Sequence, residues 1–125
     1  MKAKILSTVA AVLMIGVILV ALPLTIPKLF GITIHNLLTP SMEPALAVGS
    51  AVYAAPCAPE SLEPGEIAVY YPDEATSLVQ THRVVENDSQ LQQLITKGDA
   101  NAETDAAPGP YSRGVGKVVF SIPLL

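Results

Sequence analysis

The sequence predicts a mainly β protein in which one N-terminal transmembrane helix precedes a small all-β domain. The first observation is an apolar run near the start, residues 5–22, that holds no charge and no proline. The second is a series of short β-branched and aromatic runs, separated by turn-forming residues, in the rest of the chain. The third is size: 125 residues, 50% hydrophobic, are too apolar for an ordinary soluble domain and too few for two domains.

The apolar run is long enough to cross a bilayer. Its 18 residues, Ile5 to Leu22, would rise about 27 Å as an α-helix, which is close to the hydrocarbon thickness. Weaker apolar character continues to Pro27. We therefore expect a short terminus over residues 1–4, a retained anchor over residues 5–27 and a β domain over residues 28–125.

A cleaved secretory signal is the competing interpretation, because a basic start followed by an apolar run is typical of one. The run is longer than the usual apolar region of about 7–15 residues. The flank from Leu22 to Lys28 also lacks a small-x-small cleavage pattern. These two observations favour the anchor.

The charges on the two sides of the span predict its orientation. Lys2, Lys4 and the α-amino group precede it, whereas only Lys28 follows it closely. The positive-inside tendency then holds the N-terminus in the cytoplasm. We expect a single-pass protein of the cell membrane whose β domain lies outside the cytoplasm.

Beyond the span the chain is acidic. From residue 28 onward, five lysine and arginine residues stand against all eleven acidic residues, which gives this part a net charge of −6. This excess argues against nucleic acid as a partner and against strong adhesion to anionic lipid. Cys57 is the only cysteine, so no internal disulfide is possible, and its proline-rich surroundings favour a loop thiol over a catalytic one.

Six short segments are expected as strands because each is rich in β-branched or aromatic residues and is bounded by turn signals. They are Ile32–Ile34, Ala51–Tyr53, Ile67–Tyr71, Thr81–Glu86, Leu91–Thr96 and Val115–Ile122. No long segment after residue 30 has helical periodicity. The longest irregular stretch runs from Asp99 to Arg113.

One strand pairing bears on chemistry. The strands over 81–86 and 91–96 should form a hairpin, because only a few turn-forming residues join them. With Asp88–Ser89 as the centre of the turn, His82 would lie opposite Ile95. The return strand would then lead the acidic residues that follow it toward the histidine.

Ser41 is the candidate nucleophile. It lies within Thr39-Pro40-Ser41-Met42-Glu43-Pro44. The two prolines fix φ at their own positions, and the first restricts Thr39 to an extended conformation. Such a rigid, non-helical backbone can present a serine with its N–H directed at an oxyanion. Taken alone, however, a serine beside proline is more often a turn residue.

A serine hydroxyl needs a neighbouring base, and imidazole is the commonest one. The chain has two histidines: His35 follows the span closely, and His82 opens an apolar strand. Taken alone, His82 is more often a structural hydrogen-bonding residue, and Asp99 after Gly98 more often a turn residue. A hydroxyl, a histidine and acidic residues beyond one membrane span together favour a hydrolase working at the bilayer surface.

Several motifs follow one another in a characteristic order and spacing: Thr39–Pro44, Gly49, Pro64–Ile67, Thr81–Val84, Lys97–Asn101 and Asp105. This order resembles signal peptidase I, and the likeness covers nearly the whole chain. It is similar to the serine/histidine branch of that family, found in the endoplasmic reticulum, archaea and some Gram-positive bacteria. The other branch has lysine where this chain has His82.

The resemblance implies a role for each matching residue. Ser41 corresponds to the nucleophile, and His82 to the general base that later protonates the leaving amine. Asp99 and Asp105 both match acidic positions of the family, and one of them is expected to orient His82. The sequence leaves the choice open, with a lean toward Asp105. Thr39 matches a position whose hydroxyl assists the oxyanion, together with the Ser41 N–H.

The resemblance further implies a signal-peptidase-like catalytic domain that removes signal peptides from exported precursor proteins. The expected partners are these precursors and the lipid bilayer, and the secretion translocon is a further candidate. No metal or organic cofactor is implied, because the histidines and acids lack ligand spacing and there is no phosphate loop. Two alternatives stay open: narrow processing of a few precursors, and a non-catalytic membrane-tethered binding module.

Overall fold

The computed structural model describes residues 1–123. It divides the chain into two compact units, residues 1–31 and a unit that begins at Ile32. The elements, in chain order, are α1 (Lys2–Leu29), β1 (Thr33–Asn36), β2 (Ala51–Ala55), a 3₁₀ turn (Pro59–Ser61), β3 (Ile67–Tyr70), β4 (Gln80–Asp88), β5 (Gln93–Lys97), β6 (Gly109–Pro110), a second 3₁₀ turn (Tyr111–Arg113) and β7 (Gly114–Ile122).

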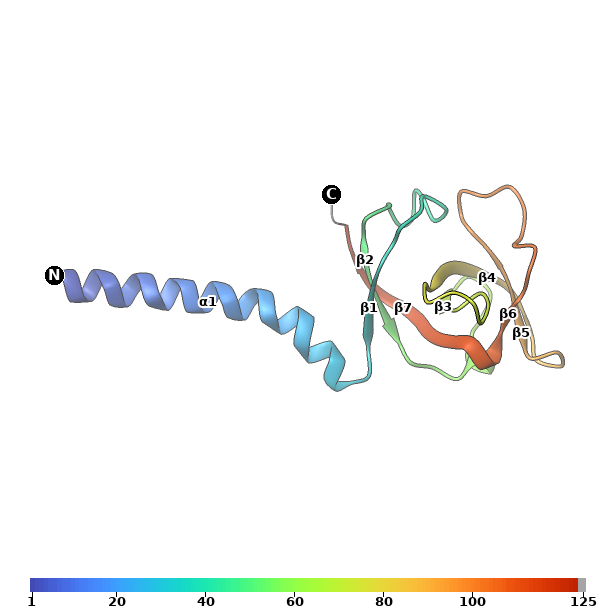
Figure 1. Ribbon diagram of the computed structural model, residues 1–125, viewed down its shortest axis with the longest axis horizontal. Helices are drawn as coiled ribbons and strands as arrows, with labels where there is room; N and C mark the ends of the chain where they lie inside the picture. Colours follow the sequence, from blue (N-terminus) through green and yellow to red (C-terminus); the bar gives the residue numbers. More distant parts are fainter. Residues whose placement is uncertain (124–125) are drawn as a thin grey trace. The chain divides into compact units, whose positions relative to one another are not determined.

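Helix α1 accounts for the whole apolar start of the chain. It has 28 residues, none of them buried, and an 18-residue stretch of it has a mean hydropathy of 2.8. By length and composition it can cross a membrane. Pro23 and Pro27 lie inside its last turns. Since proline removes a backbone hydrogen bond and displaces the preceding turn, these residues account for the bend at this end of the helix (Figure 1).

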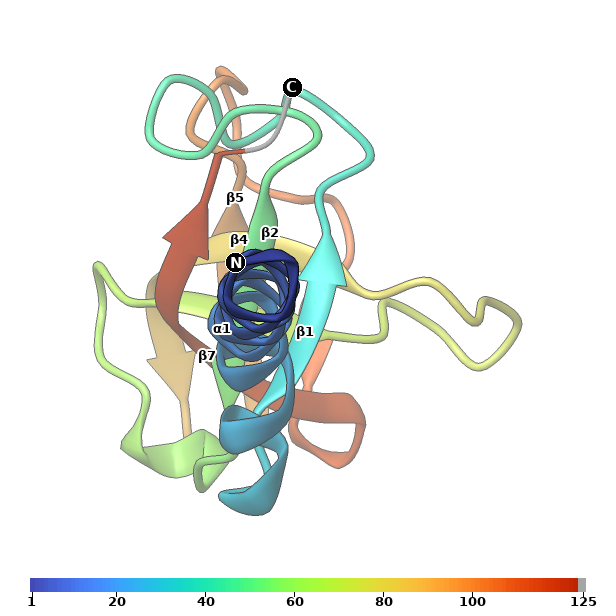
Figure 2. The same ribbon diagram turned by 90° about the vertical axis from the view of Figure 1, so that its left-hand side faces the viewer.

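The second unit is one seven-stranded sheet with the strand order β1-β2-β7-β3-β4-β5-β6. Every pairing in it is antiparallel. Strand β1 lies at one edge beside β2, as Figure 2 shows. The mainly β fold with one N-terminal apolar helix, predicted from the sequence, is confirmed.

Two local predictions about the sheet are wrong. The hairpin of β4 and β5 forms, but Ile95 pairs with Glu86 and not with His82. The register differs because the loop spans residues 89–92 and a bulge at Val85 adds one residue to β4. In addition, Gly109–Pro110, which lies in the stretch expected to be irregular, forms the short strand β6 against β5.

The core of the β unit has two hydrophobic clusters, and one of them includes side chains of the β1–β2 loop. One lies under β3, β4 and β5 and consists of Leu62, Ala68, Tyr70, Val84 and Leu94. The other lies where the β1–β2 loop meets the sheet and consists of Leu37, Met42, Leu46 and Val52. The second cluster anchors residues 37–50, so the turn that carries Ser41 is fixed by burial of its neighbours.

The loops over residues 37–50 and 98–108 lie side by side at the top of the β unit in Figure 1. A backbone hydrogen bond from the Ala100 N–H to the Ser41 carbonyl, 2.8 Å long, joins them. The N-terminal half of β4 runs beside these loops. The fold therefore brings together three segments in which the sequence analysis located candidate functional residues.

Candidate active site

Ser41 lies on a tight turn between β1 and β2. The Glu43 N–H donates to the Pro40 carbonyl at 3.0 Å and closes the turn around Ser41. The next residue, Met42, is only 1% exposed and packs in the hydrophobic cluster beneath the loop. Burial of Met42 fixes the turn from below, and Ser41 remains half-buried at the surface above it.

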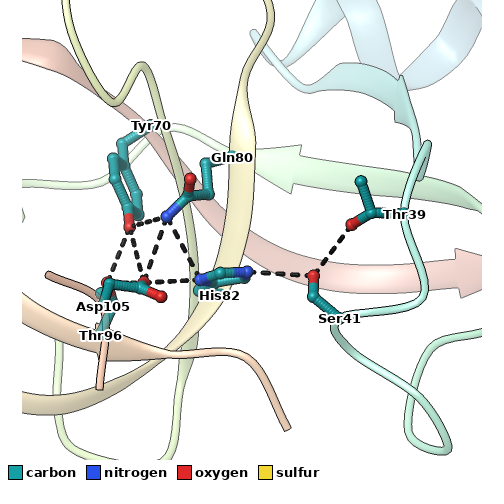
Figure 3. Close-up of polar contacts among 7 residues, drawn as sticks. All are labelled: Thr39, Ser41, Tyr70, Gln80, His82, Thr96 and Asp105. Carbon is teal, nitrogen blue, oxygen red and sulfur yellow. Dashed lines mark hydrogen bonds and ion pairs between the residues drawn. The ribbon is translucent and has the colours of Figure 1, made fainter. Parts of the chain in front are cut away.

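Ser41, His82 and Asp105 form a line of hydrogen bonds (Figure 3). The Ser41 Oγ lies 3.0 Å from His82 Nε2. The other ring nitrogen, Nδ1, lies 2.6 Å from Asp105 Oδ2. The histidine and aspartate side chains are only 10% and 14% exposed. A hydroxyl, an imidazole and a carboxylate therefore meet in a site from which most water is excluded.

The contacts fix where the protons lie. Because the Asp105 carboxylate accepts a hydrogen bond, His82 Nδ1 carries the proton and Nε2 is the acceptor that faces Ser41. The Ser41 hydroxyl therefore donates to the ring. Thr39 Oγ1 lies 3.0 Å from Ser41 Oγ, so the Thr39 hydroxyl is the donor in that pair. The Ser41 hydroxyl thus points its proton at His82 Nε2, while its oxygen accepts a hydrogen bond from Thr39.

A second set of side chains surrounds the carboxylate of Asp105. The Thr96 hydroxyl donates to Oδ2 at 2.6 Å, and the Gln80 amide N–H donates to the same oxygen at 3.1 Å. Behind them, the Tyr70 hydroxyl lies 2.7 Å from Thr96 Oγ1 and 2.8 Å from Gln80 Nε2. Burial raises the pKa of Tyr70, which keeps its hydroxyl protonated. Neutral donors therefore surround the Asp105 carboxylate.

Asp99 makes a different contact. Its two carboxylate oxygens accept from the Arg83 Nε at 2.8 Å and from an Arg83 terminal nitrogen at 2.7 Å. The Arg83 hydrogen bond, more than any other cause, lowers the pKa of Asp99, and the same pairing raises the pKa of Arg83. Successive side chains on a strand point to opposite faces, so Arg83 points away from His82. Asp99, which pairs with Arg83, therefore lies on the face of β4 opposite His82.

The turn that carries Asp99 is pressed against Ser41. A Cβ at Gly98 would lie 2.7 Å from the Ser41 carbonyl oxygen and 3.1 Å from the Ser41 Cβ. Such contacts are too short for any side chain, so this close approach requires glycine. The Ala100 N–H then donates to the same carbonyl oxygen. The candidate nucleophile is therefore held against residues 98–100 through its backbone.

A cleft of about 230 Å³ opens beside Ser41 and His82. One wall consists of residues between Asn36 and Ser41, and the other of residues between Thr76 and His82. A neighbouring cleft of about 320 Å³ shares Asn36, Leu38, Leu78 and Val79 with it. Strand β1 lies at the edge of the sheet next to both clefts. An extended peptide could therefore lie along this edge with one carbonyl at Ser41.

Two reactive residues lie apart from this line. His35 Nε2 lies 2.8 Å from Thr33 Oγ1 and lines the neighbouring cleft, and partial burial lowers the pKa of His35. Cys57 is half-buried, and burial is the main cause that raises the pKa of its thiol. A raised pKa leaves little thiolate at neutral pH. In residues 1–123, no three histidine, cysteine or acidic side chains form a cluster that could hold a metal ion.

The structure thus brings together four of the five residues that the sequence singled out. Ser41 contacts His82, His82 contacts Asp105, and Thr39 contacts Ser41. Asp99, which the hairpin led us to expect near His82, contacts Arg83.

Sequence reasoning missed three residues of the network, namely Gln80, Tyr70 and Thr96. Gln80 carried a usable signal, because a residue two positions before His82 on a strand shares its face. Tyr70 and Thr96 carried none, since their meeting depends on how three strands align.

Comparison with known proteins finds a similar protein. No protein-family model matches the chain. Over 85 residues the chain is 35% identical to signal peptidase I W of Bacillus subtilis (strain 168). The aligned part covers 66% of this chain, and the chain spans 44% of the length of that protein. The likeness supports the signal peptidase I family for this chain.

Proposed function

We propose that this protein is a membrane-anchored serine endopeptidase of the serine/histidine branch of signal peptidase I, and that it cleaves signal peptides from exported precursor proteins. The observation that carries the proposal is the line from Ser41 Oγ through His82 to Asp105, with distances of 3.0 and 2.6 Å, at the wall of a cleft. The similarity to a signal peptidase supports the same conclusion.

In the proposed mechanism, Ser41 attacks the scissile carbonyl while His82 Nε2 accepts the serine proton. The Asp105 carboxylate stabilises the imidazolium that forms and keeps the ring in one tautomer. The imidazolium then protonates the leaving amine, and the product is an acyl-enzyme on Ser41. A water molecule, deprotonated by the same histidine, hydrolyses the acyl-enzyme and restores the hydroxyl.

The tetrahedral intermediate needs donors for its negative oxygen. We assign this role to the Ser41 N–H and the Thr39 hydroxyl. Thr39 Oγ1 already lies 3.0 Å from Ser41 Oγ, which is close to where the oxyanion would form. Removing one oxyanion donor typically costs about 10²–10³-fold in rate. Thr39→Val should therefore lower kcat while leaving the fold intact.

The proposed substrate lies extended along the edge of β1, opposite residues 78–82, and pairs with main-chain groups there. Partners therefore include signal-peptide-bearing precursors, and the secretion translocon that delivers them is a further candidate. Helix α1 anchors the enzyme in the lipid bilayer, close to where a precursor leaves it. Lys2 and Lys4 precede the span, so the N-terminus is assigned to the cytoplasm and the β unit to the outside.

The decisive experiment is cleavage of a purified precursor in detergent by the wild type and by Ser41→Ala. The wild type should cut the precursor once, and Ser41→Ala should be inactive although folded. The matched control is Ser89→Ala, which removes a hydroxyl from the exposed β4–β5 loop and should behave as the wild type. Retention of more than a tenth of the wild-type rate by Ser41→Ala would remove the serine from the mechanism.

Protease accessibility tests the orientation. The loop over residues 98–108 is largely exposed in the β unit. A protease added outside intact protoplasts should cut it if the domain lies outside the membrane. Full protection until lysis would reverse the assigned orientation and contradict a role in export.

A further inference from the structure

We propose that Gln80 is a positioning residue for the His82–Asp105 pair: from the wall of the cleft, its amide holds the carboxylate turned toward the imidazole. This inference rests on the proposed function, since it deepens the account of the same site. Gln80 is not among the residues that match the family motifs, so its role comes from the geometry alone.

Both N–H groups of the Gln80 amide are used in the structure. Gln80 Nε2 lies 3.1 Å from Asp105 Oδ2 and 2.8 Å from the Tyr70 hydroxyl oxygen. The reverse orientation of the amide would place its carbonyl oxygen against a carboxylate, which is repulsive. The contact with Asp105 therefore fixes the orientation of the amide.

The remaining hydrogen bonds run in one direction and end at the same atom. The Thr96 hydroxyl donates its one proton to Asp105 Oδ2, so the Tyr70 hydroxyl is the donor to Thr96, and the Tyr70 oxygen accepts from Gln80 (Figure 3). Asp105 Oδ2 therefore receives close donors from Thr96, Gln80 and His82, and the Tyr70 hydroxyl approaches it more loosely, at 3.4 Å. With several fixed donors on one oxygen, the carboxylate is not free to turn away from the imidazole.

Gln80 differs from its two partners in where it lies. Tyr70 is 1% exposed and Thr96 is fully buried, whereas Gln80 is half-buried and lines the cleft beside Ser41. It also approaches His82 Nδ1 to 3.2 Å. Gln80 is thus the member of this network that lines the cleft beside His82. A peptide bound in the cleft would close over it.

The other charges near the histidine are already balanced. On the opposite face of β4, Arg83 neutralises Asp99, whose pKa is lowered to smaller extents by Lys97 and His82. Tyr70 contributes a neutral hydroxyl, and Ser41 another. A new negative charge introduced at position 80 would therefore act directly on Asp105 and His82, which Gln80 Nε2 approaches to 3.1 and 3.2 Å.

The first test removes the amide without changing the length of the side chain. In the full-length protein in detergent, Gln80→Met should lower kcat by at least about tenfold, well short of the roughly 10⁴-fold loss that a missing triad carboxylate can cause. KM and the melting temperature should stay near the wild-type values. The matched control is Gln90→Met in the exposed β4–β5 loop, which should change none of these quantities.

The second test adds a charge at the same position. Gln80→Glu places a carboxylate beside Asp105 and close to His82, and a negative charge within about 4–6 Å favours the imidazolium. The acid limb of the kcat/KM profile should move to higher pH by about one unit or more. An unmoved acid limb, or a Gln80→Met variant whose only defect is a higher KM or a lower melting temperature, would overturn the assignment.

A spectroscopic measurement separates this inference from the proposed function. The chain has two histidines, so ¹⁵N-histidine labelling gives one reporter at the site and an internal reference at His35. The His82 Nδ1 proton signal should shift or exchange faster with water in Gln80→Met, while the His35 signals stay unchanged. If neither the wild type nor the Ser41→Ala protein cleaves precursors, the proposed function fails. An unchanged His82 signal in Gln80→Met would contradict the positioning role whatever the activity.

Discussion

Two consecutive residues of β4 take carboxylates from the same loop, and the two pairs differ in what they can do. His82 faces the cleft and contacts Asp105, whereas Arg83 faces away and contacts Asp99. The guanidinium is always charged, so the second pair is a permanent ion pair with bidentate geometry. The imidazole can gain and lose a proton, so the first pair can take part in chemistry. Because side chains alternate along β4, the His82–Asp105 contact, for which we propose proton transfer, lies on one face of the strand, and the Arg83–Asp99 ion pair lies on the other.

The largest effects are expected where the first pair meets the serine. Ser41→Ala and His82→Ala should each lower kcat/KM by 10³-fold or more, up to about 10⁶-fold. The double variant should be hardly worse than either single one, because members of one catalytic unit are non-additive. Single-turnover cleavage of a precursor measures all three. If the two losses multiply strictly, Ser41 and His82 act independently and are not a catalytic unit.

The comparison of the two aspartates is the next test. Asp105→Asn should lower activity by up to about 10⁴-fold while the melting temperature changes little, because the histidine loses its charged partner. Asp99→Asn should lower stability and activity together, since the turn against Ser41 loosens. Cleavage rates and thermal unfolding, measured on both variants, check this. Near wild-type cleavage by Asp105→Asn would reduce the site to a Ser41–His82 dyad.

The stability effect of the second pair should be modest. Loss of a charged partner by Arg83 is expected to cost about 1–3 kcal/mol, toward the low end because both side chains are partly exposed to solvent. A matched control is the ion pair of Arg113 with Glu74, whose acid is 87% exposed. Glu74→Gln should leave the free energy of unfolding almost unchanged. Equal losses in Asp99→Asn and Glu74→Gln would mean that the Arg83 pair has no special structural role.

The same pair predicts a pH dependence of stability. The folded-state pKa of Asp99 is lowered, mainly by its hydrogen bond from Arg83. A lowered pKa contributes stability above the unfolded-state value of about 3.9 and loses it as pH falls through the folded-state value. The difference in unfolding free energy between the wild type and Asp99→Asn should therefore be constant from neutral pH to about pH 5 and shrink at lower pH. Denaturant unfolding at several pH values measures it, and a difference that disappears near pH 6 would contradict this origin.

The smallest effect is expected at the other histidine. His35 contacts Thr33 and lies outside the line formed by Ser41, His82 and Asp105. His35→Ala should therefore change kcat/KM by no more than a few-fold on an ordinary precursor. A loss as large as that of His82→Ala would require a different assignment of the base.

Much of the fold could be predicted because its signals are local. The apolar run from Ile5 to Leu22 and the β-branched segments define helix α1 and six of the strands. The register of the β4–β5 hairpin could not be predicted, since one bulge at Val85 and a longer loop shift every later pair. Strand β6 was missed because its glycine and proline are turn residues by composition.

The candidate site divides in the same way. Ser41 and His82 could be singled out because their types and local motifs are distinctive. The choice between Asp99 and Asp105 could not be made, because it depends on which face of β4 each carboxylate reaches. The contacts of Gln80 depend on how strands β3, β4 and β5 align. The only sign of them in the sequence is the two-residue spacing between Gln80 and His82, which places both side chains on one face of a strand.

The packing of Gly98 against Ser41 has a consequence for how this protein can evolve. Any side chain at position 98 would come within 2.7 Å of the Ser41 carbonyl oxygen, which is main chain and has no rotamer to adopt. Substitution there would force the backbone at Ser41 or the turn over residues 98–100 to move. The missing side chain at position 98 is therefore what lets the turn over residues 98–100 pack directly against the backbone of the candidate nucleophile.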